Sequence, residues 1–452
     1  MTRVRLVLPA LLCLAVARPA LAFCGFYVAK ADASLYNHGS QVVIARDGDR
    51  TVLTISNDFK GPLNEFAEVV PVPALITREQ VHIGDRRLLE RIDGYSAPRL
   101  VEYHDPDPCS PPMRAWGFGR GMGGGGIMGK AEAVYRRADS FGVKIEAEYS
   151  VGEYDIVILS AKQSTGLEDW LVAEGYRIPP KAAAALEPYV KQAMKFFVAK
   201  VNLKAQQSTG FTYLRPIQIA YESDKFMLPI RLGMANSEGT QDLTIYTLTR
   251  SGRVESTNYR TVELPTGEDV PTFVKDDFKA FYRALFTRAW EKEDRKAVFT
   301  EYAWDGGWCD PCADQPLSRE ELRGLGVFWL DDDSVVPRRW YGRRTAPIVT
   351  RLHVRYDAAD FPEDLVFQET GNRQNYQARY VLRWPFRGAL DCEAGQRYLG
   401  QLDERRPTEA RTLADLTGWE LPNVLEQRGD GPPGRLPKAK ADVPWYRRLW
   451  GN

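Results

Sequence analysis

Two cysteines separated by two residues form the sharpest chemical pattern in this sequence, Trp308-Cys309-Asp310-Pro311-Cys312. A thiolate at Cys309 could attack a disulfide of another molecule, and Cys312 could then resolve the mixed disulfide. The alternative is a structural disulfide, formed within the pair or with Cys24, Cys109 or Cys392. We expect the structural disulfide and keep thiol-disulfide oxidoreductase activity as the main alternative function.

The motif is similar to the W-C-x-P-C active site of thioredoxin-like oxidoreductases, where the first cysteine opens a helix whose amide groups stabilise the thiolate. The resemblance implies that Cys309 is the nucleophile and Cys312 the resolving thiol, with residues 297–304 as the preceding strand. However, Pro316 and a capping-box pattern at Ser318 place the next helix several residues beyond Cys312. We therefore expect the pair to lie in a loop without a helix dipole.

A second cluster gathers an imidazole, two carboxylates and a thiol within six residues, at His104, Asp105, Asp107 and Cys109. These residue types bind metal ions. The intervening prolines hold the segment extended and project its side chains apart, which makes a single chelate awkward. We expect no bound metal, and a metal-binding exported protein remains a further alternative.

Two other patterns suggest ligands but lack essential residues. Residues 124–130 have the glycine and lysine spacing of a phosphate-binding loop, yet Ala131 replaces the Ser or Thr that would bind magnesium. Residues 331–334 are acidic but lack the glycine and distal glutamate of a calcium loop. With no convergent acid, base and nucleophile set either, we expect no cofactor and lean towards a protein that is not an enzyme.

The N-terminus has the three parts of a secretory signal peptide. Arg3 and Arg5 supply positive charge, residues 6–16 form an apolar run, and Ala20-Leu21-Ala22 is a small-x-small cleavage site. We expect cleavage after Ala22 and a soluble periplasmic or extracellular product. Lipid anchoring at Cys24 is disfavoured because Phe23 is too large for the position before a lipid-bearing cysteine.

The amino-acid composition argues against some classes of binding partner. The chain has 452 residues, 44% of them hydrophobic, and its 60 basic residues balance its 60 acidic ones. Such a chain can bury a large core, but it has no global field that would attract nucleic acid. No later run reaches the roughly 18 apolar residues of a membrane helix. We predict no nucleic-acid partner and no transmembrane segment after cleavage, and an envelope protein is the candidate partner.

The sequence predicts both strands and helices around these residues. Alternating and apolar runs predict strands at residues 143–149 and 154–161, and a hairpin around residues 46–49. Helical spacing predicts helices at residues 186–197 and 273–290. Strand-like runs return at residues 327–330, 348–356 and 376–384. The fold class is α+β, with mixed or antiparallel sheets, a few packed helices and disulfides.

The cysteines and the linker-like segments suggest how the chain is divided. Five cysteines remain after cleavage, Cys24, Cys109, Cys309, Cys312 and Cys392, so two disulfides and one free thiol are expected. Their connectivity cannot be read from the sequence. The predicted parts are a signal peptide (1–22), a β-rich part (23–104), a Pro/Gly-rich loop or linker (105–135), a main α+β domain (136–400), and a C-terminal helix with a partly disordered tail (401–452).

Taken together, several stretches resemble a bacterial family known only as domain of unknown function twenty-three-thirty. They are residues 23–27, 69–73, 154–176, 228–232, 308–312 and 361–365. The resemblance implies an exported bacterial protein with one long family domain, and it supplies no activity or catalytic residues. The function we expect is a non-catalytic binding or envelope-associated component.

Overall fold

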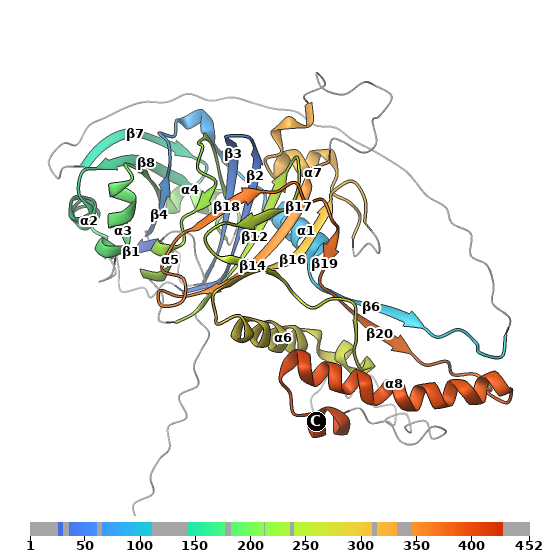
Figure 1. The fold of residues 1–452 in the computed structure, drawn as a ribbon. Coiled ribbons are helices and arrows are strands. Elements are labelled where there is room, and N and C mark those ends of the chain that lie inside the picture. The colour runs from blue at the N-terminus through green and yellow to red at the C-terminus, as the bar shows by residue number, and fades with distance from the viewer. Residues whose placement is uncertain are drawn as a thin grey trace, which may run out of the picture.

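The computed structural model describes residues 26–29, 36–60, 66–110, 143–176, 182–211, 213–235, 239–309, 314–331 and 346–427. Within these residues the protein is α+β, as predicted, with layers in the order helix, sheet, sheet, helix (Figure 1). Several features considered above lie outside them: residues 1–22, Cys24, the glycine-rich segment 124–130, Cys312, residues 332–334 and the C-terminal residues 428–452.

One antiparallel sheet is buried on both faces. Ile156 and Ile158 face the second sheet, whereas Val157 and Leu159 face two helices, because successive side chains of a strand point to opposite sides. This is why the strand reads as a continuous apolar run. The strand order is β1 (Phe26–Ala29), β4 (Phe66–Val72), β9 (Lys195–Val201), β8 (Tyr154–Ala161) and β7 (Val143–Val151), and the helices are α2 (Ser164–Ala173) and α3 (Ala182–Lys191).

A larger mixed sheet packs against the first across the main core. Val42 and Ile44 point into that core, and Val43 and Ala45 point to the opposite face. The order within the described residues is β14 (Arg260–Glu263), β16 (Ala297–Asp305), β17 (Ile348–Tyr356), β12 (Gln241–Thr249), β2 (Tyr36–Asp47), β3 (Arg50–Lys60), β10 (Ile217–Glu222) and β5 (Val81–Ile83), with β19 (Tyr376–Gln377) beside β16.

Helices cover the outer face of this larger sheet in two groups, each with its own apolar cluster. Phe281, Leu285 and Phe286 form the buried stripe that the helical spacing predicts. The first group is α1 (Arg86–Ser96), α7 (Arg319–Gly324) and η3 (Phe328–Asp331), and the second is η2 (Thr272–Asp277), α6 (Phe278–Lys292), α8 (Glu393–Thr417) and α9 (Leu421–Gln427). The short elements η1 (Arg78–Gln80) and α4 (Leu203–Ser208) flank the sheets.

Several local predictions are confirmed. The hairpin closes through Asp47 paired with Arg50, and Gly48 takes the left-handed conformation (φ 64°) that its turn requires. The two strands predicted at residues 143–161 pair with each other. Ser318 and Glu321 form the predicted capping box.

Other local predictions are wrong. The helix expected to reach Phe197 ends at Lys191, because Ala193 adopts a positive φ of 55° and the chain then enters β9. The strand-like run at residues 327–330 contains the 3-10 helix η3 instead. Both errors arise because short apolar runs fit more than one period.

The predicted division into parts remains a prediction. Strands β2 and β3 from its N-terminal part are inner strands of the larger sheet, next to β12 and β10. Helix α8 begins before residue 400 and continues beyond it.

Two of the stretches that carry the family resemblance meet in space. Strand β11 (Met227–Leu228) pairs with β18 (Leu365–Glu369), which also pairs with β13 (Val254–Ser256). The buried Asp364 carboxylate accepts hydrogen bonds from the Ile230 amide at 2.9 Å and the Arg231 amide at 3.2 Å, at the start of α5 (Arg231–Ala235). The Tyr189 hydroxyl donates to the same oxygen at 2.6 Å. Asp364 therefore ties the second stretch to the first and to α3.

Replacing Asp364 with Ala should lower the free energy of unfolding by about 2–3 kcal/mol, because it leaves buried donors without an acceptor. Urea denaturation measures the change. Glu363→Gln is the matched control, since Glu363 is exposed and pairs with the Arg231 side chain; it should cost less than about 1 kcal/mol. Equal losses in the two variants would contradict this role for Asp364.

Candidate binding site

A parallel ribbon of three strands extends away from the two sheets, with helix α8 alongside it (Figure 1). At its base Tyr380 and Leu382 lie in the apolar cluster of α6 and α8, whereas Tyr103 at its tip is 45% exposed. Parallel sheets are normally covered on both faces, so an uncovered tip is unusual. The strands are β15 (Glu268–Asp269), β20 (Arg379–Trp384) and β6 (Arg99–His104). We call this ribbon, together with residues 105–110 and 385–405, the arm.

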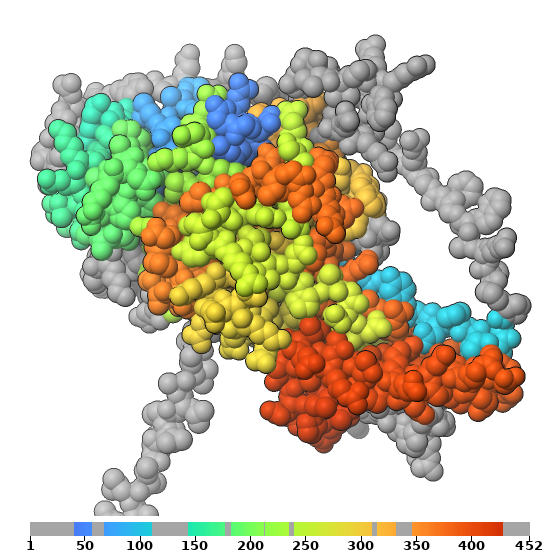
Figure 2. Space-filling model, viewed as in Figure 1, coloured from blue at the N-terminus to red at the C-terminus, as the bar shows by residue number. Residues whose placement is uncertain are grey.

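Within the arm, two links fasten the segment that follows β6 to the N-terminal half of α8. The first is a disulfide between Cys109 and Cys392, whose Cα atoms are 5.9 Å apart although 283 residues separate them in sequence. The second is Asp105, whose carboxylate accepts hydrogen bonds from the Tyr398 hydroxyl at 2.6 Å and from Arg405 at 2.8 Å. The ribbon and the helix are thus joined near the tip of the ribbon, and the two segments lie together at the lower right of Figure 2.

A cavity of about 570 Å³ adjoins the tip of the ribbon. The Trp384 indole forms its wall, with the His104 ring stacked beside it at 6.2 Å between centres and the Lys275 ammonium 5.7 Å from the ring centre. Trp384 and Lys275 also donate hydrogen bonds to Glu102, at 2.8 and 2.9 Å, and these bonds lower the pKa of its carboxyl group. We call this the aromatic cavity; its lining is Glu102, His104, Asp105, Lys275, Trp384, Pro385, Phe386 and Arg387.

A second cavity, of about 520 Å³, lies on the other face of the ribbon against α8. Arg383 faces it because neighbouring side chains of a strand alternate, and both oxygens of Asp269 accept from its Nε at 2.8 and 3.0 Å. Glu268 and Glu404 form no ion pair with another described residue, so this cavity has spare negative charge. We call it the acidic cavity; its lining is Gly267, Glu268, Asp269, Arg383, Gln401, Glu404, Arg405, Thr408, Glu409 and Thr412.

The four residues of the predicted metal-binding cluster all lie on the arm, but they have different structural roles. His104 and Asp105 line the aromatic cavity. The Cys109 sulfur is bonded to Cys392, and the Asp107 carboxylate accepts a hydrogen bond from the backbone amide of Cys109. Among the described residues, no group of three His, Cys, Asp or Glu side chains could hold a metal ion.

Sequence reasoning did not identify Lys275, Trp384 and Arg387 as site residues. Lys275 lies in η2, whereas Trp384 and Arg387 lie at and just beyond the end of β20. Both segments are far in sequence from β6, which pairs with β20 and supplies Glu102 and His104. The one local signal was an aromatic residue, Trp384, at the end of a predicted strand and followed by Pro385.

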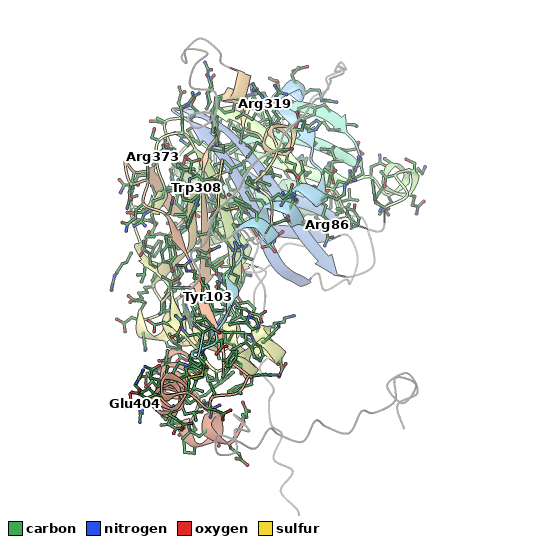
Figure 3. All side chains as sticks on the ribbon, turned by 90° about the vertical axis from the view of Figure 1, so that its right-hand side faces the viewer. Arg86, Tyr103, Trp308, Arg319, Arg373 and Glu404 are labelled. Atoms are coloured by element: carbon green, nitrogen blue, oxygen red, sulfur yellow. A yellow bond between two sulfur atoms is a disulfide. The ribbon has the colours of Figure 1, made fainter. Side chains whose placement is uncertain are left out.

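Cys309 lies elsewhere, next to the α1 and α7 cluster. It is disulfide-bonded. Because Cys109 and Cys392 are bonded to each other, the candidate partners that remain from the sequence analysis are Cys24 and Cys312, and both lie outside the described residues. Among the described residues, the next helix after Cys309 is α7, which starts at Arg319. The neighbouring Trp308 is 41% exposed and lies far from the arm residues Tyr103 and Glu404 (Figure 3).

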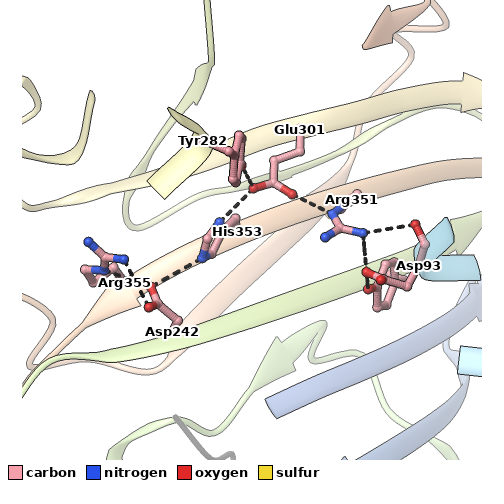
Figure 4. A network of polar contacts seen from close by, with 8 residues as sticks. Asp93, Asp242, Tyr282, Glu301, Arg351, His353 and Arg355 are labelled. Carbon is pink, nitrogen blue, oxygen red and sulfur yellow. Dashed lines mark hydrogen bonds and ion pairs between the residues drawn. The ribbon is translucent and has the colours of Figure 1, made fainter. Parts of the chain in front are cut away.

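A network of charged side chains connects strands of the larger sheet with helices α1 and α6 (Figure 4). Glu301 of β16 is almost fully buried, and its carboxylate accepts from Arg351 at 2.5 Å and contacts His353 at 2.7 Å. The Tyr282 hydroxyl of α6 also donates to it. Arg351 also donates a hydrogen bond to the carboxylate of Asp93 in α1 at 2.6 Å.

The network is balanced in charge. Arg351, His353 and Arg355 share one face of β17 at alternate positions, and each contacts at least one of three carboxylates from other elements. His353 contacts Asp242 of β12 at 3.3 Å, and Arg355 holds that carboxylate at 2.8 and 3.1 Å. Both imidazole nitrogens are engaged, and no member of the network lines either arm cavity. We interpret it as a structural lock between β17 and its neighbours.

This network should make stability depend on pH. Burial alone would lower the pKa of His353, but Glu301 and Asp242 outweigh it and raise the pKa to about 8. A histidine with a raised pKa stabilises the fold fully below its unfolded value of about 6.5, and this contribution is lost as pH rises through 8. We expect a loss of about 2 kcal/mol between pH 6 and 9.

Urea denaturation at the two pH values measures this loss. His353→Gln should remove most of the pH dependence. His82→Gln should preserve it, because His82 is an exposed residue at the edge of the same sheet. If the wild type and His353→Gln show the same pH dependence, the assignment to His353 is wrong.

The comparisons with known proteins place the chain in a family. Residues 18–368 match the model of a family described as "Uncharacterized protein conserved in bacteria (DUF2330)". No curated protein matches the chain. No solved structure matches it either. No helix among the described residues is long and apolar enough to cross a membrane.

Proposed function

Since the chain belongs to this family of uncharacterised bacterial proteins, we propose that it is an exported, non-catalytic binding component whose ligand is held by the arm. The observation that carries the proposal is the pair of cavities flanking an uncovered ribbon that a disulfide fastens to α8. Ligand sites are typically concave, partly aromatic and about 300–1,000 Å³ in volume, and both cavities have this size.

The absence of catalysis in this proposal rests on where the perturbed ionisable groups lie. Catalytic acids and bases have shifted pKa values and open onto a cleft. Here Glu301 and His353 have shifted pKa values, yet their polar atoms contact one another and buried partners inside the network. In the aromatic cavity the pKa of Glu102 is also shifted, but its carboxylate is already engaged by Lys275 and by the Trp384 indole.

Export is supported by the signal-like N-terminus and by the disulfide. Disulfides form and persist in oxidising compartments and are rare in the bacterial cytoplasm. The Cys109–Cys392 bond closes a long loop and fastens the candidate site, so the arm would lack it in a reducing compartment. Soluble release after Ala22, rather than lipid anchoring at Cys24, remains part of the proposal.

Intact mass spectrometry of the protein from separated bacterial fractions tests export. We expect the main species in the periplasmic or extracellular fraction to begin at Phe23. Non-reduced peptide mapping should recover the Cys109–Cys392 peptide pair. A cytoplasmic protein that begins at Met1 and has free thiols would contradict export.

Ligand binding can be tested without knowing the natural ligand. Saturation-transfer NMR would screen the purified mature protein against a defined panel of small sugars, carboxylates, amines and amino acids. We expect some members to bind and to lose binding in Trp384→Ala. Phe211→Ala, which changes an exposed aromatic residue outside both cavities, should bind them normally. The proposal fails if no panel member depends on Trp384.

The alternative function is thiol-disulfide exchange by Cys309 and Cys312. The observation in its favour is that Cys309 is disulfide-bonded beside the exposed Trp308, and the distance of α7 counts against it. Insulin reduction by the mature protein distinguishes the two functions: the binding proposal expects no excess rate over the variant with both cysteines changed to Ser. The metal-binding alternative would require metal in protein purified from the periplasm.

A further inference from the structure

We propose that the aromatic cavity binds an acidic sugar, that is, a small carboxylate attached to a ring with an apolar face. This inference rests on the proposed binding function and specifies its ligand class. It follows from which charges around the cavity are already paired and which are free to interact.

The carboxylates of the cavity already have donors. Glu102 accepts from Lys275 and from the Trp384 indole, and Asp105 accepts from Tyr398 and Arg405. A cationic ligand would have to displace these internal donors. The two acidic groups therefore fix the walls of the cavity rather than attract a ligand.

One cation of the cavity has no partner of opposite charge. Arg387 is exposed and forms no ion pair with another described residue, whereas Lys275 is paired with Glu102. Arg387 lies just beyond the end of β20 and lines the cavity, where its guanidinium can present two parallel donors to a carboxylate. The spare charge of this cavity is thus positive, whereas that of the acidic cavity is negative.

The wall next to these cations is aromatic and apolar. Trp384, Pro385 and Phe386 follow one another along the lining, and both aromatic rings are partly exposed. An aromatic and apolar wall packs against the flat C–H face of a sugar ring while the hydroxyl groups remain hydrated. A ring face against the wall formed by residues 384–386 and a carboxylate near Arg387 together describe an acidic sugar.

Calorimetric titration of the mature protein with D-galacturonate, D-galactose and benzoate tests this proposal. Galacturonate should bind at least tenfold tighter than galactose, which lacks the charge, and at least tenfold tighter than benzoate, which lacks the sugar hydroxyls. Arg387→Gln should abolish the preference for galacturonate. Arg397→Gln removes the same charge from α8 outside the cavity and should leave the preference intact.

A second variant changes shape without changing charge. A Cβ at position 388 would lie 2.2 Å from Cζ of Phe386, so Gly388→Ala must displace that ring. We expect this variant to bind galacturonate and galactose more weakly than the wild type does, by similar factors. Equal binding of galacturonate and galactose to the wild type, or tighter binding of benzoate, would overturn the acidic-sugar class.

The acidic-sugar proposal and the proposal that the arm binds a ligand can fail separately. If none of the three probes binds while other panel compounds depend on Trp384, the acidic-sugar class is wrong and binding by the arm stands. If no compound depends on Trp384, both proposals are wrong.

Discussion

Replacing Glu301 with Gln should lower the free energy of unfolding by about 3–5 kcal/mol, the largest effect of any substitution considered. The change removes the carboxylate shared by Arg351 and His353 and leaves two buried cations without their common counter-charge. Removing one partner of a buried ion pair costs this much because the remaining charge stays desolvated. Denaturant titration at pH 6, where His353 is protonated, measures the effect.

A matched surface pair provides the control. Arg50 and Glu222 face each other across β3 and β10 of the same sheet, and both side chains are largely exposed. Glu222→Gln should change the free energy of unfolding by less than about 1 kcal/mol, because exposed pairs are well solvated. If Glu301→Gln costs no more than Glu222→Gln, the buried network does not lock the sheet.

Changing both Cys109 and Cys392 to Ser should also destabilise the protein strongly. The bond joins residues 283 positions apart, and the chain-entropy relation gives on the order of 5 kcal/mol for a loop of this length. We expect a measured loss of about 2–5 kcal/mol, the usual cost of removing a native disulfide.

The loss should appear first at the arm. Limited proteolysis of the double variant should cut within residues 105–110 or 385–392 before it cuts the sheets, and Trp384-dependent binding should weaken. Glu393→Gln breaks only an exposed pair with Arg397 on the same helix and is the control. Unchanged protease resistance of the arm would show that the disulfide does not hold it to α8.

Local periodicity predicted the fold class well. The hairpin at Gly48, the pair of strands at residues 143–161 and the buried stripe of α6 each depend on neighbouring residues only. By contrast, the end of α3 depends on the backbone conformation at Ala193, which an apolar spacing rule does not detect.

The candidate site could be predicted only in part. His104, Asp105 and Cys109 attracted attention as a cluster of ligand-like residues, and the structure does place them on the arm. Their roles come from partners nearly 300 residues away, above all Trp384 and Cys392. No local pattern reveals such a pairing, because parallel strands are joined by long connections. The sequence likewise showed no sign that Glu301 would pair with Arg351 and His353 of β17.

Fluorine NMR of the mature protein labelled with 5-fluorotryptophan tests the central claim, binding at the arm, most directly. Trp384→Phe and Trp308→Phe variants identify the two signals that matter, one at the aromatic cavity and one beside Cys309. On titration with panel compounds that bind, the Trp384 signal should shift in a saturable way while the exposed Trp308 signal remains in place. A saturable shift at Trp308 with no change at Trp384 would contradict the account.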